Sequence, residues 1–244
     1  MERTNAYSLL DFLDNSPCNF FATATIQRYL DDNGFQELKQ SERWNLEKGG
    51  KYYVKKNDTA IFGFVIGETP LDQSGFNMIS AHSDSPCFRI KPNPEMLADG
   101  VLKLNTEVYG GPILYTWFDR PLSLAGRVIV RNPQNPARPI TKLIDFASPV
   151  LIIPHLAIHF NRNVNAGNPL SKQKDMLPIA AIVSDSMSKN NFLIDQIKER
   201  LEIADSKDIL DFDLMLYNCQ KSQLVGFNKE LICSGRNDDL SICL

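Results

Sequence analysis

The chain has 244 residues, 43% apolar and 23% charged, which is the balance of a globular protein and excludes a disordered or fibrous one. Its net charge of -3 gives no clustered basic surface of the kind that nucleic acid requires. The N-terminal sequence is charged instead of carrying a secretory apolar core, and no stretch reaches the roughly 18 uninterrupted apolar residues of a membrane span, so we expect a cytoplasmic protein without nucleic-acid or membrane partners.

The N-terminal part of the chain predicts two helices, a hairpin and one further strand. Apolar residues recur at helical spacing from about Asn5 to Asp14 and from Phe20 to Asp32, and Asn33-Gly34 ends the second run. Two β-rich runs then flank Asn57-Asp58, which is a hairpin signal, and another strand is predicted from Phe76 to Ala81. Helices followed by strands in this order indicate a mixed sheet with helices packed on it.

From Pro92 onward, short β-rich runs alternate with Gly, Pro and Asn clusters, as in a small barrel or sandwich. A long loop is predicted at 161–176, and a helix from about Lys189 to Ile203. Because longer strands return after this helix, we expect the chain to re-enter its first domain. The strands predicted in this part lie at 101–110, 122–132, 140–146, 149–160, 211–217 and 230–234, and the domains at 1–91, 92–208 and 209–244.

The five cysteines form a scattered, odd-numbered set without CxxC spacing. This pattern argues against a disulfide framework and against a structural zinc knot, so we expect buried free thiols. Cys18 with a distant histidine is the one nucleophile pairing in the sequence, and nothing near it indicates an activated thiolate.

His82 lies where an apolar run gives way to polar residues, in the sequence MISAHSDSP. Strand ends beside loops are where α/β enzymes keep their sites. In an extended strand, residues two apart face the same way, so we expect Asp84 alongside His82. A carboxylate in that position would hold the imidazole in one tautomer and make it a better metal ligand. The same pattern also fits a hydrogen-bonded core or loop histidine.

His155 and His159 are four residues apart in PHLAIHF, a spacing that on a helix would place both on one face. The metalloprotease motif with this spacing requires Glu directly after the first histidine, and Leu156 stands there instead. We therefore expect a structural role for His155, while the spacing leaves the role of His159 open.

Asp238 and Asp239 form a carboxylate pair that follows a predicted strand and a glycine. Such pairs are commonly solvated turn residues. The functional alternative is a bridging ligand, because one carboxylate can span two divalent ions in a two-metal hydrolase. Arg236 would then be a supporting partner of this carboxylate, or merely its salt bridge.

Several segments, taken in order, resemble the signature segments of the M18 family of metallo-aminopeptidases, the aspartyl aminopeptidase group. NSPCNFFA near the start and the hairpin that begins with KYY are similar to the family's opening. The resemblance runs nearly from end to end, and the ordered set is far more specific than any one motif. The main segments are MISAHSDSPCFRIKP, TEVYGG with TWFDRPLSLAGRVIV, IPHLAIHFNRNVN with LPI, and GRNDDLSIC.

The resemblance implies a two-zinc exopeptidase that removes single N-terminal residues from peptide substrates. Its fold would be an α/β, mixed-sheet catalytic domain, formed by 1–91 and 209–244, interrupted by a β-rich dimerisation or lid domain at 92–208. Members of the family form dimers that build a dodecamer, so the resemblance also implies a homo-oligomer.

Site residues follow from the same resemblance. His82 matches a zinc ligand, Asp84 the catalytic carboxylate that orients it, and Asp238 the aspartate that bridges the two zinc ions. His159 matches a histidine that reaches across a subunit interface to stabilise the tetrahedral intermediate. Mn²⁺ or Co²⁺ would suit the same ligand set as Zn²⁺.

The family pattern continues beyond Asp238 with an adjacent Glu-Glu pair, a further Asp and a final His, and no residues of this sequence match them. We therefore expect the site of this chain to be incomplete, as in a truncated enzyme or in one whose separate C-terminal half supplies the missing ligands. The alternative is a non-catalytic assembly or binding remnant of such an enzyme.

Overall fold

The computed structural model describes residues 2–70, 73, 75–183 and 191–243. The chain divides into two compact units. The first comprises the segments up to residue 85 and from residue 222, and the second comprises residues 86–221. The predicted class is confirmed, because the first unit contains helices with a mixed sheet and the second is β-rich.

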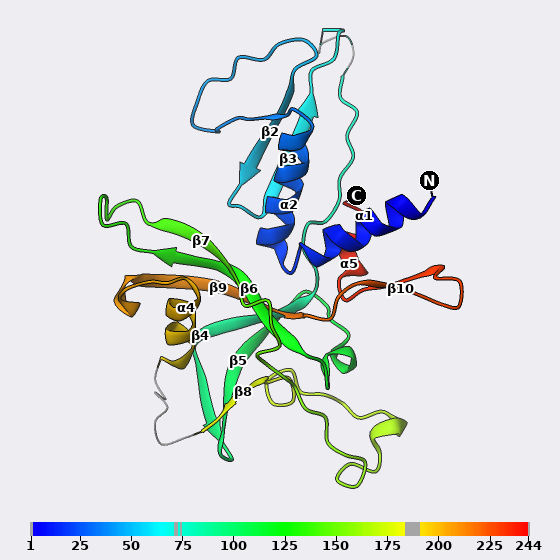
Figure 1. The fold of residues 1–244 in the computed structure, drawn as a ribbon, viewed down its shortest axis with the longest axis vertical. Helices are drawn as coiled ribbons and strands as arrows, with labels where there is room; N and C mark the ends of the chain where they lie inside the picture. The colour runs from blue at the N-terminus through cyan, green and yellow to red at the C-terminus, as the bar shows by residue number, and fades with distance from the viewer. Residues whose placement is uncertain (1, 71–72, 74, 184–190, 244) are drawn as a thin grey trace. The chain divides into compact units, whose positions relative to one another are not determined.

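The first unit begins with two helices and a small three-stranded sheet (Figure 1). These elements are α1 (Glu2–Asp14), α2 (Asn19–Asp32), β1 (Gln36–Glu37), β2 (Lys51–Lys56) and β3 (Ala60–Val65). β1 runs parallel to β2, and β2 is antiparallel to β3. Asn57, Asp58 and Thr59 join β2 to β3, and Asn57 and Asp58 have φ angles of 53° and 57°, a left-handed conformation that these residue types tolerate in turns. The predicted helices and hairpin are therefore confirmed.

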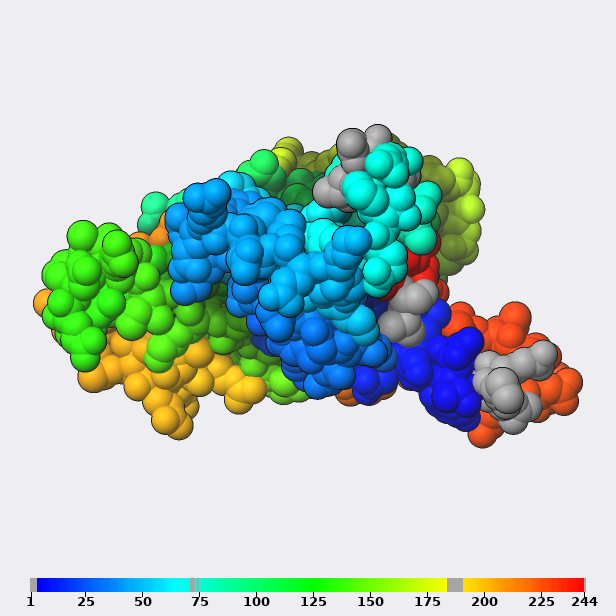
Figure 2. Space-filling view, turned by 90° about the horizontal axis from the view of Figure 1, so that it is seen from above, coloured from blue at the N-terminus to red at the C-terminus, as the bar shows by residue number. Residues whose placement is uncertain are grey.

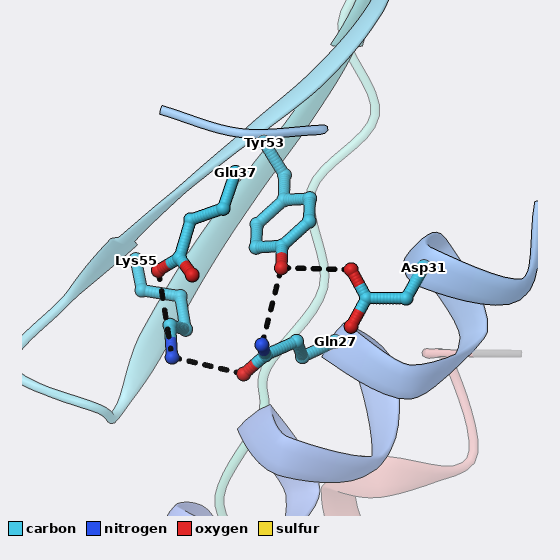
Figure 3. Close-up of polar contacts among 5 residues, drawn as sticks. All are labelled: Gln27, Asp31, Glu37, Tyr53 and Lys55. Carbon is cyan, nitrogen blue, oxygen red and sulfur yellow. Dashed lines mark hydrogen bonds and ion pairs between the residues drawn. The ribbon is translucent and has the colours of Figure 1, made fainter. Parts of the chain in front are cut away.

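A chain of polar contacts ties α2 to this sheet (Figure 3). The hydroxyl of Tyr53, whose ring is buried, donates to Asp31 at 2.8 Å and accepts from Gln27 Nε2 at 3.1 Å. The amide oxygen of Gln27 accepts from Lys55 Nζ at 2.9 Å, and Lys55 pairs with Glu37 of β1 at 3.5 Å. Because a buried hydroxyl is costly when unpaired, these contacts favour one placement of α2 on the sheet.

Residues 76–81 form no strand with any other residue of the described ranges, so the strand predicted there is wrong for this structure. A strand needs a neighbour for its backbone groups, and local sequence does not reveal whether one is present.

The first unit ends with a second hairpin and a short helix. These elements are β10 (Gln223–Val225), β11 (Leu231–Cys233) and α5 (Asn237–Leu240). β11 coincides with the strand predicted at 230–234.

A small apolar cluster holds the beginning and the end of the first unit together. Leu240 of α5 is buried in one cluster with Phe12 and Leu13 of α1 and Ala22 of α2. Burial of these side chains removes apolar surface from water and holds α5 against α1 and α2.

The second unit is built on one antiparallel sheet with the order β7-β6-β9-β4-β5-β8 (Figure 1). In the described residues β7 and β8 are the open edges, so the sheet is not a closed barrel. Its strands are β4 (Cys87–Ala98), β5 (Val101–Tyr109), β6 (Leu122–Val130), β7 (Ile140–Asp145), β8 (Ile179–Ile182) and β9 (Ile209–Asn218). The helical segments are η1 (Leu114–Trp117), η2 (Val164–Ala166), α4 (Phe192–Arg200) and η3 (Ser206–Asp208).

The core of the second unit lies between this sheet and α4. Leu193 and Ile197 of α4 share one buried cluster with Leu124 of β6 and Leu214 and Leu216 of β9. The cluster members recur at two-residue intervals along the strands, as Leu122 and Leu124 do on β6 and Leu214 and Leu216 on β9, because side chains two apart face the same side of a sheet.

Strand β4 was not predicted, because its sequence contains two prolines, which remove ladder hydrogen bonds. The register of β4 on β5 shifts between Ile90 and Glu95, and Asn93 there has a φ angle of 51°. Pro92 and Pro94 thus lie in an irregularity of the strand that tolerates them. The domain boundary predicted at residues 91–92 falls inside β4, and β9 belongs to the second unit. The catalytic and lid roles of the two units stay predictions.

Other predicted elements of this part are confirmed in part. The run 149–160 forms only isolated bridges at residues 151–153 before Pro154. The loop at 161–176 contains no strand and only the short η2. The predicted helix corresponds to α4, and its expected start at Lys189 lies outside the described residues. Within the described ranges no helix has the length and apolar character needed to cross a lipid bilayer.

None of the five cysteines, all of which lie in the described residues, forms a disulfide, as predicted. Only Cys18 is buried, however, and Cys233 is exposed. Cys87, Cys219 and Cys243 lie between these extremes, so the expectation of uniformly buried thiols is wrong.

Candidate metal centre

His82 and Asp84 lie together in the first unit, directly after residues 76–81. Nδ1 of His82 is 3.1 Å from Oδ1 of Asp84. With its proton on Nδ1, the imidazole donates to the carboxylate and keeps the lone pair of Nε2 available as a ligand. The His82 side chain is 70% exposed and that of Asp84 31% exposed, so the ring is open to a ligand.

The segment that carries Asp238 lies beside this pair. The backbone N–H of Asp239 donates to the carbonyl of Asp84 at 3.5 Å, and the thiol of Cys243 donates to the carbonyl of His82 at 2.8 Å. The peptide bond between Asp238 and Asp239 is cis. Two chain segments that are far apart in sequence thus bring His82, Asp84 and Asp238 into one region of the first unit.

Buried Arg236 anchors the start of α5 to α1. Its Nε and one terminal nitrogen donate to the carbonyl oxygen of Leu13 at 3.2 and 2.8 Å. The last carbonyl groups of a helix have no partner within the helix, so a buried guanidinium near the end of α1 satisfies one of them. Arg236 therefore positions the segment of Asp238 through a backbone contact that the sequence analysis did not foresee.

Cys243 is a second feature of this region that was not predicted. Partial burial raises the pKa of its thiol, and the charges of Asp239 and Asp84 raise this pKa further. The negative charges of these carboxylates disfavour a thiolate. No motif indicates this contact, because Cys243 meets His82 only through the fold.

The types of donor in this region suit zinc, since an imidazole oriented by a carboxylate and a further aspartate are ordinary zinc ligands. Their number does not suffice. Across the residues that the structure describes, no group of three or more His, Cys, Asp or Glu side chains is arranged to hold a metal ion. A catalytic zinc normally takes three protein ligands besides its water, and the described residues do not supply such a set.

The other two histidines lie in the second unit and are described separately. His155 is half-buried, with its ring edge-on to Phe118 at a centroid distance of 4.6 Å and its backbone N–H donating to Asp119 at 3.0 Å. It lines a hollow of about 290 Å³, and these contacts agree with the structural role expected for it. His159 is exposed on a turn at 158–160. Because this segment is not helical, the two histidines do not share a helix face.

Comparison with known proteins gives one consistent result. The model of the family described as aminopeptidase I zinc metalloprotease (M18) matches residues 12–244. A probable M18 family aminopeptidase 2 of Clostridium novyi is 51% identical over 236 residues, which cover 96% of this chain and 54% of the relative. A probable M18 family aminopeptidase 2 of Clostridium acetobutylicum is 48% identical and is also covered over 54% of its length. The chain thus spans about half the length of these curated relatives.

A solved structure is similar to this chain in the same way. Chaetomium thermophilum mApe1 superposes with a TM-score of 0.84 at 30% identity, over 96% of this chain and 55% of that chain.

Proposed function

The chain belongs to the M18 family of zinc metalloproteases, and we propose that it supplies part of the active site of an aminopeptidase that removes single N-terminal residues from peptides. The observation that carries this proposal is the position of the His82–Asp84 pair beside the segment of Asp238. An oriented imidazole and a neighbouring carboxylate are the donors that hydrolytic zinc centres use.

In this proposal each residue has a separate task. His82 would hold one zinc ion through Nε2, while Asp84 accepts a hydrogen bond from Nδ1–H and keeps the ring in that orientation. Asp238 would be the aspartate that two zinc ions share. Zinc, when bound, polarises the peptide carbonyl and lowers the pKa of a water molecule. Manganese or cobalt would be accepted by the same donors.

We propose that the remaining ligands and the general base come from a part of the protein outside this chain. Two observations support this: the described residues hold no complete ligand set, and the chain spans about half the length of its curated relatives. The missing groups would lie in the same polypeptide or in a separate C-terminal half. The competing function is a non-catalytic assembly or binding remnant, which would keep the fold without turnover.

His159 is proposed to act in the active site of a neighbouring subunit, in dimers that build a dodecamer. Its exposure on a turn supports this role, because an exposed imidazole is accessible to a partner. There it would donate a hydrogen bond to the carbonyl oxygen as negative charge develops on it. A mixture of His82→Ala and His159→Ala subunits, each inactive alone, should then recover about a quarter of wild-type activity through random pairing. No recovery in the mixture would remove this role.

The proposed activity is tested by hydrolysis of N-terminal aminoacyl substrates by this chain assembled with the rest of the M18 protein, in the presence of zinc or manganese. We expect turnover that falls by more than about 100-fold in His82→Ala and in Asp238→Asn, since each removes a ligand. His155→Ala is the matched control and should stay near wild type. Absence of turnover in the assembled wild type would favour the non-catalytic remnant.

A further inference from the structure

The second unit contains a hollow of about 290 Å³. Its walls include Lys103 of β5, Phe118 after η1, the segment 154–156 and the loop at 161–176. Much of this loop is exposed, and parts of it are in view as the yellow-green stretch of the space-filling picture (Figure 2). Pockets for drug-sized ligands measure about 300 to 1,000 Å³, so this hollow suits a smaller molecule.

Two lysine side chains bring positive charge to the hollow. Lys103 and Lys174 both line it, and neither forms an ion pair within the ranges that the structure describes. Asn161 and Asn168 line it too, and the side-chain amide of each can donate hydrogen bonds. Ammonium groups without a counter-charge, together with amide donors, favour a ligand that carries a carboxylate.

One carboxylate of the protein limits which anion the hollow can accept. Asp175 lines it as well, and Oδ2 of Asp175 accepts a hydrogen bond from the backbone N–H of Ser171 at 2.7 Å, which holds the group in place. A polyanion such as phosphate would be repelled by this negative charge, whereas an ammonium group would be attracted to it. Charges of both signs in one small hollow therefore favour a zwitterion.

Apolar side chains complete the walls of the hollow. Phe118 and Leu170 are partly buried and pack against the core of the second unit. A ligand with an apolar group would remove that group and part of this wall from water, which stabilises binding. The apolar lining includes Phe118, Leu170, Leu177 and Ile179.

The loop that forms one wall is held by hydrogen bonds within the second unit. The hydroxyl of Tyr115 donates to the carbonyl of Asn168 and accepts from the backbone N–H of Asn168 at 3.3 Å. The backbone N–H of Asp175 donates to the carbonyl of Ser171 at 2.9 Å. Because these contacts fix the wall before a ligand arrives, less conformational freedom is lost on binding.

We propose that this hollow binds a free α-amino acid with an apolar side chain. The carboxylate of the ligand pairs with Lys103 and Lys174, and its ammonium group pairs with Asp175. Its side chain lies against Phe118 and Leu170. A free amino acid is also the class of product that an aminopeptidase releases, but the inference rests on the lining residues and not on the activity proposed above. Its test is therefore a binding measurement, which does not depend on turnover.

Isothermal titration calorimetry of this chain with leucine measures the binding. We expect a dissociation constant on the order of 1 mM or lower, an affinity that so small a ligand can reach. Leucinamide lacks the carboxylate and N-acetyl-leucine lacks the ammonium group, so each should bind at least about tenfold more weakly than leucine. Inorganic phosphate at the same concentration should not displace leucine.

Variants of the charged lining residues test the same contacts from the side of the protein. Lys103→Met and Asp175→Asn should each weaken leucine binding at least about tenfold, and the asparagine keeps an oxygen acceptor for the N–H of Ser171. Lys174→Met should have the same effect and is the second test if β5 does not tolerate the change at Lys103. Lys172→Met is the control, because Lys172 is an exposed lysine of the same loop that does not line the hollow.

Circular dichroism of each variant should match that of wild type, so that a loss of binding reports a lost contact and not unfolding. No binding of leucine in the millimolar range would overturn the proposal. Wild-type affinity in Lys174→Met and Asp175→Asn, or N-acetyl-leucine bound as tightly as leucine, would overturn it as well.

Discussion

Replacing Gly126 with alanine tests the pairing of β6 with β9 at the centre of the second unit. Gly126 is opposite Leu214 in the register of these strands. The Cβ atom of the alanine would lie 2.0 Å from the backbone oxygen of Asp213 and 2.9 Å from Cα of Leu214. Both are backbone atoms, so no change of rotamer relieves the overlap, and the two strands would have to separate.

Overpacking of a core costs about 1 to 3 kcal/mol and sometimes more, and an overlap with backbone on this scale belongs at the upper end. We therefore expect a loss of about 3 kcal/mol in the free energy of unfolding. For a chain of this size each kcal/mol corresponds to about 2 to 4 °C, so the melting temperature should fall by about 6 to 12 °C.

Thermal and urea unfolding followed by circular dichroism measure this loss. Gly111→Ala is the matched control in the same unit, because its added Cβ would meet no atom within 4 Å. That control should remain within about 0.5 kcal/mol of wild type. Equal melting temperatures for wild type and Gly126→Ala would refute the register described for β6 and β9.

Three further predictions follow from buried polar groups. Tyr53→Phe removes the hydrogen bonds that the hydroxyl makes with Asp31 and Gln27, and should lower the free energy of unfolding by about 1 to 2 kcal/mol in urea unfolding. Burial and then the hydrogen bond to Asp31 raise the pKa of Tyr53 to about 12, and burial also raises the pKa of Tyr217. Because the folded state favours the neutral form of these tyrosines, their contribution to the free energy of unfolding is complete below pH 10 and should be lost as pH rises from about 10 towards 12. Urea unfolding measured at a series of pH values will detect this loss. Arg236→Met removes the hydrogen bonds that the guanidinium donates to the carbonyl of Leu13, which keeps the longer bond from the backbone N–H of Ser16 at 3.3 Å. The loss should cost about 1 to 3 kcal/mol in urea unfolding.

Matched variants and a spectroscopic titration separate these effects from general damage. Tyr29→Phe alters an exposed tyrosine of α2, and Arg43→Met an exposed arginine, so both should unfold like wild type. If Tyr53→Phe unfolds like Tyr29→Phe, the hydrogen bonds of the Tyr53 hydroxyl contribute nothing to the free energy of unfolding. The same holds for the hydrogen bonds of Arg236 if Arg236→Met unfolds like Arg43→Met. Absorbance of tyrosinate should show Tyr53 and Tyr217 ionising after the other tyrosines, and a single step near pH 10 would contradict their burial.

The elements that the sequence predicted well are those with a local cause. Helical periodicity located α1 and α2, and Asn57-Asp58 located the hairpin because these residues tolerate positive φ. Strand β4 was missed because Pro92 and Pro94 argue against a strand, and only the partner strand reveals the irregularity that accommodates them. Residues 76–81 show the converse, since a strand-like sequence forms no strand without a neighbour.

In the candidate metal centre too, the sequence predicted the contact with a local cause and missed the contacts that depend on the fold. The two-residue spacing of His82 and Asp84 predicted their contact, which the structure places at 3.1 Å. The proximity of Asp238 depends on a fold that brings 237–243 beside 82–84, and only the family resemblance indicated it. The contacts of Arg236 with Leu13 and of Cys243 with His82 join residues that are 223 and 161 positions apart in the sequence, so no local pattern could predict them.

We propose that this chain holds part of a zinc aminopeptidase centre, which another part of the M18 protein completes. Aminoacyl hydrolysis measured side by side, for this chain alone and for this chain assembled with the remaining part, tests it most directly. In the presence of zinc we predict turnover by the assembled protein only. Robust turnover by this chain alone, abolished in His82→Ala, would contradict the account, because the residues described here would then suffice for catalysis.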